Sequence, residues 1–402
     1  MIGVAVLGST GSVGESTLDV LARHPERFRL VAVAAHHSAG KLAAQIRSWQ
    51  PAYAALADES ALGELRALLG TAAPHTRLLG GAGALEEIAT LPEVDCVMAA
   101  IVGAAGLRST LAAARAGKRL LLANKESLVM GGPLLVAAVR ESGATLLPID
   151  SEHNAIFQCL PAGVRTGVAP PGLTRVLLTA SGGPFRETPR AALAEATPEM
   201  ACAHPVWVMG RKISVDSATL MNKGLELIEA CLLFGLTPAQ VAILVHPQSI
   251  VHSLVEYADG STLAQLSAPD MRTPIAYGLG WPERISAGVE FLDLLKAGRL
   301  DFHPPDYDKF RCLALARAAA LAGGLQPVTL NAANEVAVQA FLERRLNFPG
   351  IAAVIEAVME RDAGGAIGGL DDILAADAEG RQRARERIVG VTRSGSVRDA
   401  HA

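Results

Sequence analysis

A glycine-rich turn close to the start of the chain constrains the fold more than any other feature of the sequence. Residues 8–14 read Gly-Ser-Thr-Gly-Ser-Val-Gly and directly follow the apolar run 2–7. An unbroken apolar run of this length is typical of a strand that is buried on both faces of a parallel sheet. A helical pattern with Leu18 and Leu21 on one face comes next, and a second apolar run occupies residues 30–35. This order predicts a βαβ unit with a glycine turn between its first strand and its helix.

The same alternation of short apolar runs and helical stretches continues to about residue 150. The further strand-like runs are residues 53–56, 96–100, 119–123 and 145–149. Alternation of this kind is typical of α/β proteins, in which helices cover both faces of a parallel sheet. We therefore predict an N-terminal Rossmann-like domain with a doubly wound parallel sheet over residues 1–150.

The pattern changes after residue 150. Strand-like runs at residues 176–179 and 242–245 are mixed with long polar loops, and an alanine- and leucine-rich helical pattern follows from residue 311. The predicted segments are a central α/β catalytic domain (151–285), a linker (286–310), a small helical C-terminal domain (311–390) and a disordered tail (391–402).

The glycine turn is suited to hold the phosphate groups of a dinucleotide. Glycines allow positive φ angles and a close approach of the ligand, and the helix N-terminus that follows presents free N–H groups. The second apolar run leads into His36, His37 and Ser38, with Lys41 soon after, and carries no carboxylate. NAD sites usually place an acidic residue there, whereas imidazoles, a hydroxyl and a lysine tolerate a 2′-phosphate. The sequence therefore favours NADPH, and the competing interpretation is a tight turn without a ligand.

Charge and cysteine content limit the compartment and the partners. The formal net charge of −4 argues against a broad nucleic-acid interface. The five cysteines are odd in number and none has CxxC spacing, so we expect reduced thiols. The apolar start has no basic region before it, and the other apolar runs are short or contain charges. We therefore expect a cytoplasmic protein with neither a nucleic-acid nor a membrane partner.

Three carboxylates are candidates for a metal site. Asp150 and Glu152 follow a predicted strand at the sheet edge where open α/β folds bind ligands, and in an extended chain their side chains point the same way. Glu226 shares one face of a predicted helix with Asn222 and Lys223. Carboxylates without a thiolate favour a hard divalent cation, Mg²⁺ or Mn²⁺. The competing interpretation is a helix cap at Asp150 or at the serine that follows it.

Polar residues at predicted strand and helix ends are suited to hold a phosphate group. Ser181 precedes two glycines, and Ser217, Asn222 and Lys223 add a hydroxyl, an amide and an ammonium group. Lys125 follows another strand end near the same edge of the sheet. Together they predict a pocket for a phosphate dianion, although each residue alone also fits an ordinary turn or surface position.

Residues 204–210, with the sequence His-Pro-Val-Trp-Val-Met-Gly, have the character of a lid that closes over a substrate and excludes water. The competing interpretation is a loop that anchors in the core. Cys202 lies two residues before His204, but nothing else in the sequence supports a thiol nucleophile.

Six motifs occur together in an order and spacing that resemble a known family. They are residues 8–14, Ala-Asn-Lys-Glu at 123–126, Asp-Ser-Glu-His-Asn-Ala at 150–155, Ala-Ser-Gly-Gly-Pro-Phe-Arg at 180–186, Asp-Ser-Ala-Thr-Leu-Met-Asn-Lys-Gly-Leu-Glu at 216–226 and His-Pro-Gln-Ser at 246–249. The chain resembles the 1-deoxy-D-xylulose 5-phosphate reductoisomerase family over nearly its whole length. The resemblance implies rearrangement of this sugar phosphate and its reduction with NADPH to 2-C-methyl-D-erythritol 4-phosphate, a step toward isoprenoid precursors. It also implies a homodimer of three-domain subunits.

Matching the motifs residue by residue implies a role for each candidate. The metal ligands would be Asp150, Glu152 and Glu226. The substrate contacts would be Lys125, Ser151, Glu152, Ser181, His204, Ser217, Asn222, Lys223 and Glu226. The cofactor contacts would be Thr10, Gly11, Ser12, Val13, Asn124, Glu126 and Gly210, with Ser38 added from the second-strand argument. Catalysis would rest on Lys125, Asp150, Glu152, His204 and Glu226.

Two segments depart from the family pattern. Val206 and Val208 stand where many relatives have Asn and Ser, and residues 36–38 replace the Gly-Lys-Asn of some members. Two other functions compete with the resemblance. Another NADP-dependent dehydrogenase, such as a semialdehyde dehydrogenase, would need a catalytic cysteine, and a nucleotide-sensing regulatory protein would not need the carboxylates.

Overall fold

A seven-stranded parallel sheet forms the first part of the computed structural model, which describes residues 1–207, 209–362 and 364–398. The strands are β1 (Ile2–Leu7), β2 (Phe28–Ala35), β3 (Tyr53–Leu56), β4 (Arg77–Gly80), β5 (Cys96–Ala99), β6 (Arg119–Leu122) and β7 (Thr145–Pro148). Their order is β4-β3-β2-β1-β5-β6-β7, so the direction of sheet growth reverses at β1. Ligands bind at such a switch point in open α/β sheets. The predicted doubly wound sheet is confirmed, with β4 as a strand that was not predicted.

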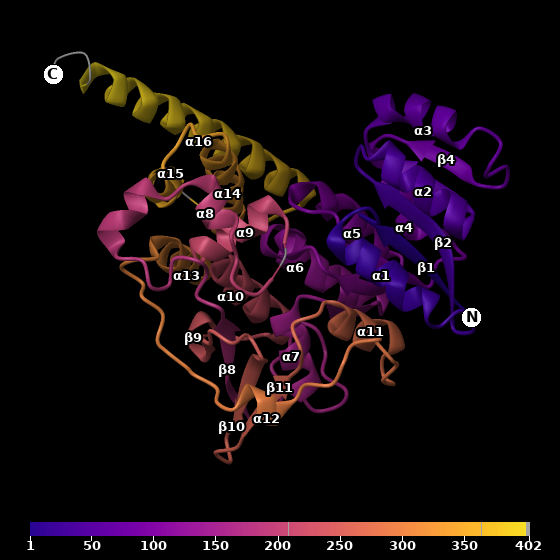
Figure 1. Cartoon of the computed structure of the whole chain (residues 1–402), viewed down its shortest axis with the longest axis horizontal. Helices are drawn as coiled ribbons and strands as arrows, with labels where there is room; N and C mark the ends of the chain where they lie inside the picture. Colours follow the sequence, from indigo (N-terminus) through magenta and orange to yellow (C-terminus); the bar gives the residue numbers. More distant parts are fainter. Residues whose placement is uncertain (208, 363, 399–402) are drawn as a thin grey trace. The chain divides into compact units, whose positions relative to one another are not determined.

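Helices connect the successive strands of this sheet (Figure 1, indigo to purple). They are α1 (Ser12–Ala22), α2 (Ala39–Trp49), α3 (Leu62–Leu69), α4 (Ala82–Thr90), α5 (Leu107–Arg115) and α6 (Lys125–Ser142), and α7 (Ser151–Cys159) follows the last strand, β7. The consecutive residues Val4, Ala5 and Val6 are all fully buried, so both faces of β1 are covered. Leu42 and Ile46 of α2 are buried in the same core. The unbroken apolar runs of the sequence follow from this two-sided burial.

The chain divides into two compact units, and the first of them includes a stretch from far along the sequence. Its segments are Met1–Leu128, Leu134–Gln158 and Asp270–Leu292. The last segment contains α11 (Arg272–Gly280), where a Cβ on Gly278 would lie 2.8 Å from the Ile149 side chain and 3.1 Å from that of Leu121. Glycine therefore lets α11 approach the sheet closely. This division differs from the predicted boundary at residue 150 and from the predicted linker that starts at residue 286.

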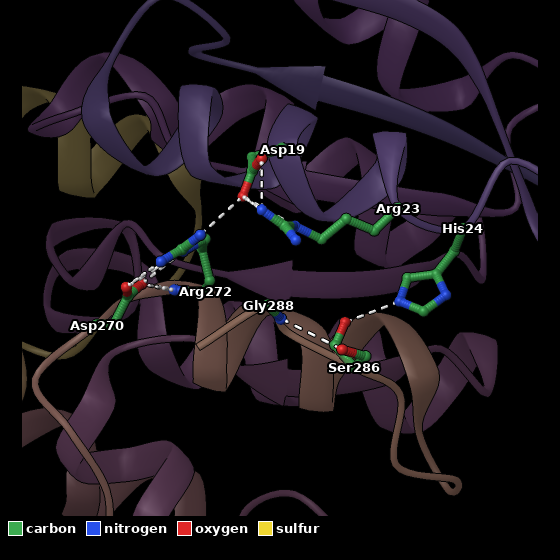
Figure 2. A network of polar contacts seen from close by, with 7 residues as sticks. All are labelled: Asp19, Arg23, His24, Asp270, Arg272, Ser286 and Gly288. Atoms are coloured by element: carbon green, nitrogen blue, oxygen red, sulfur yellow. Dashed lines mark hydrogen bonds and ion pairs between the residues drawn. The ribbon is translucent and has the colours of Figure 1, made fainter. Parts of the chain in front are cut away.

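Polar contacts attach this returning segment to helix α1, as Figure 2 shows. Arg272 donates hydrogen bonds to Asp270 at 2.7 Å and to Asp19 of α1 at 3.1 Å. Just beyond the end of α1, the Nε2 atom of His24 lies 2.8 Å from the carbonyl oxygen of Ser286. Because α1 begins in the glycine turn, these contacts support the helix that carries this turn.

The second unit contains a smaller sheet with the order β11-β10-β8-β9. Its strands are β8 (Leu173–Ala180), β9 (Val241–Val245), β10 (Val251–Tyr257) and β11 (Thr262–Leu266), and its first helices are α8 (Pro198–Cys202), α9 (Arg211–Ala218), α10 (Met221–Phe234) and α12 (Leu294–Ala297). Strands β8 and β9 are parallel, whereas β10 is antiparallel to both β8 and β11. The predicted runs correspond to β8 and β9, whereas the antiparallel pair was not predicted.

Four long helices follow in the same unit and carry the rest of the described chain (Figure 1). They are α13 (Arg311–Ala322), α14 (Gln326–Leu342), α15 (Phe348–Met359) and α16 (Leu370–Arg398). Leu330 and Val338 of α14 are fully buried, so this helix forms the centre of the group. Helix α16 continues through residues 391–398, where the predicted disordered tail is wrong, and residues 399–402 lie outside the described part. Among the helices described, none combines the length and the apolar character that a membrane span requires.

Candidate active site

Backbone packing shapes both ends of the glycine turn between β1 and α1. Gly8 has a φ of +86°, and a Cβ there would lie 2.5 Å from the carbonyl oxygen of Ala100. A Cβ on Gly14 would lie 2.4 Å from the carbonyl oxygen of Gly8. At Gly11, which is exposed, the nearest atom to an added Cβ would be 3.4 Å away. Gly8 and Gly14 therefore fold the turn, whereas Gly11 leaves its outer side open.

The N-terminus of helix α1 lies at this open side. Its N-cap residue is Gly11, which provides no side-chain hydrogen bond, and Ser12 and Val13 form the start of the first turn. Ser12 is exposed and Val13 is half-buried. Backbone N–H groups without a capping side chain, together with the helix dipole, attract a phosphate group.

Helix α2 holds the turn in position. Ser9 and Gln45 exchange two hydrogen bonds, since Ser9 Oγ donates to Gln45 Oε1 at 2.7 Å and Gln45 Nε2 donates to the backbone carbonyl of Ser9 at 2.8 Å. The Lys41 ammonium lies 2.8 Å from Glu15 and 3.4 Å from the carbonyl oxygen of Thr10. Gln45 was not predicted, because its partner is 36 residues away in the sequence.

The segment after β2 contains the residues that were predicted to choose between NADPH and NADH. His36 and His37 are exposed, and their Nδ1 atoms lie 3.0 Å apart. Ser38 is the N-cap residue of α2 and makes no side-chain cap. NAD sites usually place an acidic residue after the second strand, but here the acidic residue Asp58 follows β3 and not β2.

Asn124 has a structural role at the end of β6. Its Oδ1 atom accepts a hydrogen bond from the N–H of Ser127 at 2.7 Å and so caps helix α6. Its Nδ2 atom donates to the carbonyl oxygens of Gly103, at 2.9 Å, and Ile101. The amide therefore holds the loop after β5 as well, and Glu126 is buried in the first turn of α6. The cap was not predicted.

Lys125 and Asp150 form an ion pair within the first unit. Lys125 Nζ lies 2.5 Å from Asp150 Oδ2, and both side chains are nearly buried. Helix α7 begins at Ser151, so the expectation of an extended Asp150–Glu152 segment is wrong. Asp150 directly precedes the helix, and Glu152 lies in its first turn, where it accepts a hydrogen bond from Ser151 Oγ at 2.6 Å. The buried His153 lies 3.9 Å from the Asp150 carboxylate.

A second lysine–carboxylate pair lies on helix α10 in the second unit. Lys223 forms an ion pair with Glu226, and both side chains are almost completely buried. Asn222 Nδ2 donates to the other oxygen of Glu226 at 2.5 Å. The prediction that these three residues share one helical face is confirmed, because i,i+3 and i,i+4 neighbours meet on a helix.

Helix α9 is fixed by a buried aspartate that was not predicted as a site residue. Asp216 is 1% exposed, lies 2.9 Å from the Lys212 ammonium and accepts a hydrogen bond from Asn334 of α14 at 2.8 Å. The helix begins after its N-cap residue Gly210, and Ser217 lies half-buried in its last turn. The partner of Asp216 is 118 residues away, so no local pattern could have revealed it.

The serine after β8 and the histidine of the predicted lid meet in the second unit. Ser181 Oγ lies 2.8 Å from His204 Nε2, and it accepts a hydrogen bond from the Gly183 N–H at 3.1 Å. His204 Nδ1 accepts hydrogen bonds from the N–H groups of Val206 and Trp207, which shape the loop. The interpretation of Gly183 as part of a free anion-binding nest is therefore weakened, since its N–H already has a partner. Val208 lies outside the described residues.

Three cysteines are unsuited to nucleophilic catalysis. All five cysteines are free, and burial raises the pKa of Cys96, Cys231 and Cys312 to about 12 each. A thiolate is the reactive form, so these residues are inert near neutral pH. Cys202 lies 3.9 Å from the carbonyl oxygen of Arg211. These three cysteines therefore give no support to the alternative function, a dehydrogenase that uses a cysteine nucleophile.

Models of three family regions match most of the sequence. Residues 4–132 match 1-deoxy-D-xylulose 5-phosphate reductoisomerase, residues 146–234 match its C-terminal domain, and residues 266–383 match a further C-terminal domain of DXP reductoisomerase. A protein named 1-deoxy-D-xylulose 5-phosphate reductoisomerase from Pseudomonas putida is 60% identical over 95% of this chain and 97% of its own length. The chain belongs to the 1-deoxy-D-xylulose 5-phosphate reductoisomerase family.

Further members of the reductoisomerase family agree in sequence and in fold. The protein of this name from Dechloromonas aromatica is 59% identical over 96% of this chain and 97% of its own length. A crystal structure of DOX-P reductoisomerase in complex with NADPH, fosmidomycin and magnesium has a TM-score of 0.91 at 47% identity and covers 96% of this chain and 98% of that one. The Zymomonas mobilis enzyme in complex with NADPH has a TM-score of 0.89 at 46% identity, with 96% and 99% covered.

Proposed function

We propose that this chain is an NADPH- and divalent-metal-dependent enzyme that converts 1-deoxy-D-xylulose 5-phosphate into 2-C-methyl-D-erythritol 4-phosphate. The product serves the non-mevalonate route to isoprenoid precursors. The observation that carries the proposal is the 60% identity to the Pseudomonas putida protein of that name over 95% of the chain. The two units supply the side chains that such a reaction needs.

The glycine turn is the proposed site of NADPH. Its open side at Gly11 and the uncapped start of α1 suit a pyrophosphate. The segment after β2 suits a 2′-phosphate, because it presents His36 and His37 and no carboxylate. The proposed cofactor contacts are Thr10, Gly11, Ser12, Val13, Ser38, Asn124, Glu126 and Gly210.

Asp150, Glu152 and Glu226 are the proposed ligands of a divalent cation. Their carboxylate oxygens suit Mg²⁺ or Mn²⁺, and the nearly buried positions of Asp150 and Glu226 demand a counter-charge. Lys125 and Lys223 supply part of this charge, one in each unit. When bound, a divalent cation supplies a Lewis acid that polarises a carbonyl group and stabilises developing negative charge.

The remaining polar residues are proposed to bind and enclose the sugar phosphate. Ser181, Ser217, Asn222 and Lys223 offer hydroxyl, amide and ammonium donors to a phosphate dianion. The proposed further substrate contacts are Lys125, Ser151, Glu152, His204 and Glu226. Residues 204–210 are the proposed lid, and closing it would exclude water from the hydride transfer.

We also propose that the enzyme is a homodimer. Strand β11 is an edge strand of the small sheet, and its Leu263 is 48% exposed. In the same unit, Leu295 of α12 is 95% exposed. Open strand edges and exposed leucines favour association, so a second copy of the chain is the proposed partner. The free cysteines support a proposed cytoplasmic location.

An NADPH oxidation assay with 1-deoxy-D-xylulose 5-phosphate tests the proposal directly. Turnover should require the sugar phosphate and Mn²⁺, should stop when EDTA removes the metal, and should return when the metal is restored. A nucleotide-sensing protein would bind NADPH without turnover, and a semialdehyde dehydrogenase would reject this ketose phosphate. Absence of turnover with metal, cofactor and substrate all present would contradict the proposed function.

A further inference from the structure

The adjacent histidines after β2 face each other through ring nitrogens at hydrogen-bond distance. Their Nδ1 atoms lie 3.0 Å apart, and the rings meet edge to face with centroids 5.3 Å apart. A hydrogen bond between two Nδ1 atoms needs a proton on one atom and a lone pair on the other. His36 and His37 can therefore keep this contact with no net charge or with one positive charge. Two positive charges would remove the acceptor and break the contact.

The charged groups around the pair come from the neighbouring elements. Asp58 follows β3, and its N–H donates to the His36 carbonyl oxygen at 2.9 Å. Hydrogen bonds from Ser60 lower the pKa of Asp58, and the nearby imidazoles lower that pKa further, so this carboxylate stays ionised. On the α2 side, the Lys41 ammonium is already paired with Glu15 of α1 at 2.8 Å.

This arrangement creates a charge problem for a bound 2′-phosphate. The Asp58 carboxylate would repel a phosphate dianion, and the Lys41 charge is balanced by Glu15. A neutral histidine pair would offer hydrogen bonds but no compensating charge. One added proton would give the pair a positive charge that both Asp58 and the phosphate stabilise, because an opposite charge nearby favours the protonated imidazole.

We infer that His36 and His37 together are the 2′-phosphate receptor, and that NADPH binding makes this pair take up one proton. The inference rests on the proposed use of NADPH and goes beyond it, since it makes cofactor choice depend on pH. NADPH should be preferred over NADH most strongly near pH 7, and less strongly as the pH rises toward 8.5. The phosphate itself stays mainly a dianion over this range, because its second pKa is about 6.

Isothermal titration calorimetry of the full-length protein measures the proton directly. Binding of NADPH at pH 7.5 is recorded in two buffers that differ in ionisation enthalpy, and NADH serves as the ligand without the 2′-phosphate. The inference predicts uptake of about half a proton or more with NADPH and about none with NADH. Adenosine 2′,5′-bisphosphate should reproduce the uptake and 5′-ADP should not, which assigns it to the 2′-phosphate.

The affinity profile provides a second measurement. Between pH 7.0 and 8.5, the ratio of the NADH and NADPH dissociation constants should fall by about 3- to 10-fold in the wild type. In the double variant His36→Asn/His37→Asn the ratio should be smaller and nearly independent of pH, because the Asn amide retains hydrogen-bonding groups near Nδ1 but cannot take up a proton.

His75→Asn is the matched control. This exposed histidine belongs to the same unit and precedes β4, so it lies at the amino end of the sheet and away from the ligand edge. Its proton uptake, affinity ratio and turnover should equal those of the wild type. If the wild type binds NADPH without proton uptake, or if the double variant keeps the wild-type pH profile, the inference is wrong while the proposed function stands. If the wild type does not bind NADPH, the proposed function itself fails.

Discussion

The glycine turn allows a prediction in which two of its glycines, Gly14 and Gly11, give opposite results when each is replaced with alanine. In Gly14→Ala, the new Cβ would lie 2.4 Å from the Gly8 carbonyl oxygen and 2.5 Å from Ser9 Cα. Both atoms belong to the backbone, so they cannot move aside as a flexible side chain would. Overpacking costs about 1–3 kcal/mol, whereas alanine gains only about 0.5–1 kcal/mol over glycine inside a helix. The clash should prevail, and the apparent thermal midpoint should fall by about 2–8 °C for a unit of this size.

In Gly11→Ala, the new Cβ has its nearest neighbour 3.4 Å away, and the φ of −86° suits alanine. Loss of a tolerated N-cap residue costs at most about 1 kcal/mol, so the thermal midpoint should change little. The methyl group occupies the open side of the turn, however, where the pyrophosphate is proposed to bind. Losing one charge-assisted hydrogen bond costs about 1.5–3 kcal/mol, which weakens NADPH binding about 10- to 100-fold.

Thermal unfolding and a fluorescence titration with NADPH measure the two effects separately. A Gly14→Ala protein with a wild-type thermal midpoint would refute the packing argument. A Gly11→Ala protein with wild-type NADPH affinity would show that the open side of the turn is not the pyrophosphate site. Opposite behaviour of the two variants is the informative result, because general damage to the turn would affect both properties in both proteins.

Three further predictions concern the cation, the returning segment and the homodimer. Glu226→Gln should lower turnover by about 100-fold or more, because this carboxylate is a proposed ligand of the cation. The NADPH affinity, measured by titration, should stay within about twofold. Lost affinity with normal turnover would contradict the proposed role. Arg23 and, to a smaller extent, Arg272 lower the pKa of Asp19, and Arg272 lowers the pKa of Asp270. These contacts therefore stabilise the fold above about pH 4, and the stabilisation is lost as acid protonates the two carboxylates. Arg272→Met should therefore reduce the thermal midpoint at pH 7 and flatten its fall between about pH 5 and 3; a fall as steep as that of the wild type would exclude these pairs as its cause. Leu295→Glu should shift the light-scattering mass toward one chain, and an unchanged dimer mass would place the interface elsewhere.

The parts of the fold that the sequence predicts are those with local patterns. The core strands of the first sheet are buried on both faces, so each appears as an unbroken apolar run that neither a loop nor a surface helix would show. Strand β11 has three exposed residues among five and no such run, and it was missed. The disordered tail was predicted to begin at residue 391 because the last residues are polar, whereas helix α16 extends to Arg398.

Contacts between distant residues could not be predicted in the same way. The Asp216–Asn334 hydrogen bond joins residues 118 positions apart, and Arg272 reaches Asp19 across 253 positions. Neither residue of such a pair differs locally from any other buried or surface polar residue. The extended backbone expected at Asp150 is wrong for a different reason, because the chain changes from strand to helix within two residues; carboxylate oxygens of Asp150 and Glu152 nevertheless lie within 4.8 Å of each other.

The two lysine–carboxylate pairs show how the acidic residues remain compatible with folding. Asp150 and Glu226 are each nearly buried, and an isolated buried carboxylate is costly unless a partner compensates its charge. Each of these two residues has a lysine partner within its own unit, which supplies part of the counter-charge. A lysine compensates one negative charge only, so two lysines leave one negative charge of the three proposed carboxylate ligands without compensation. We propose that this remaining negative charge is what favours a divalent cation at the three carboxylates.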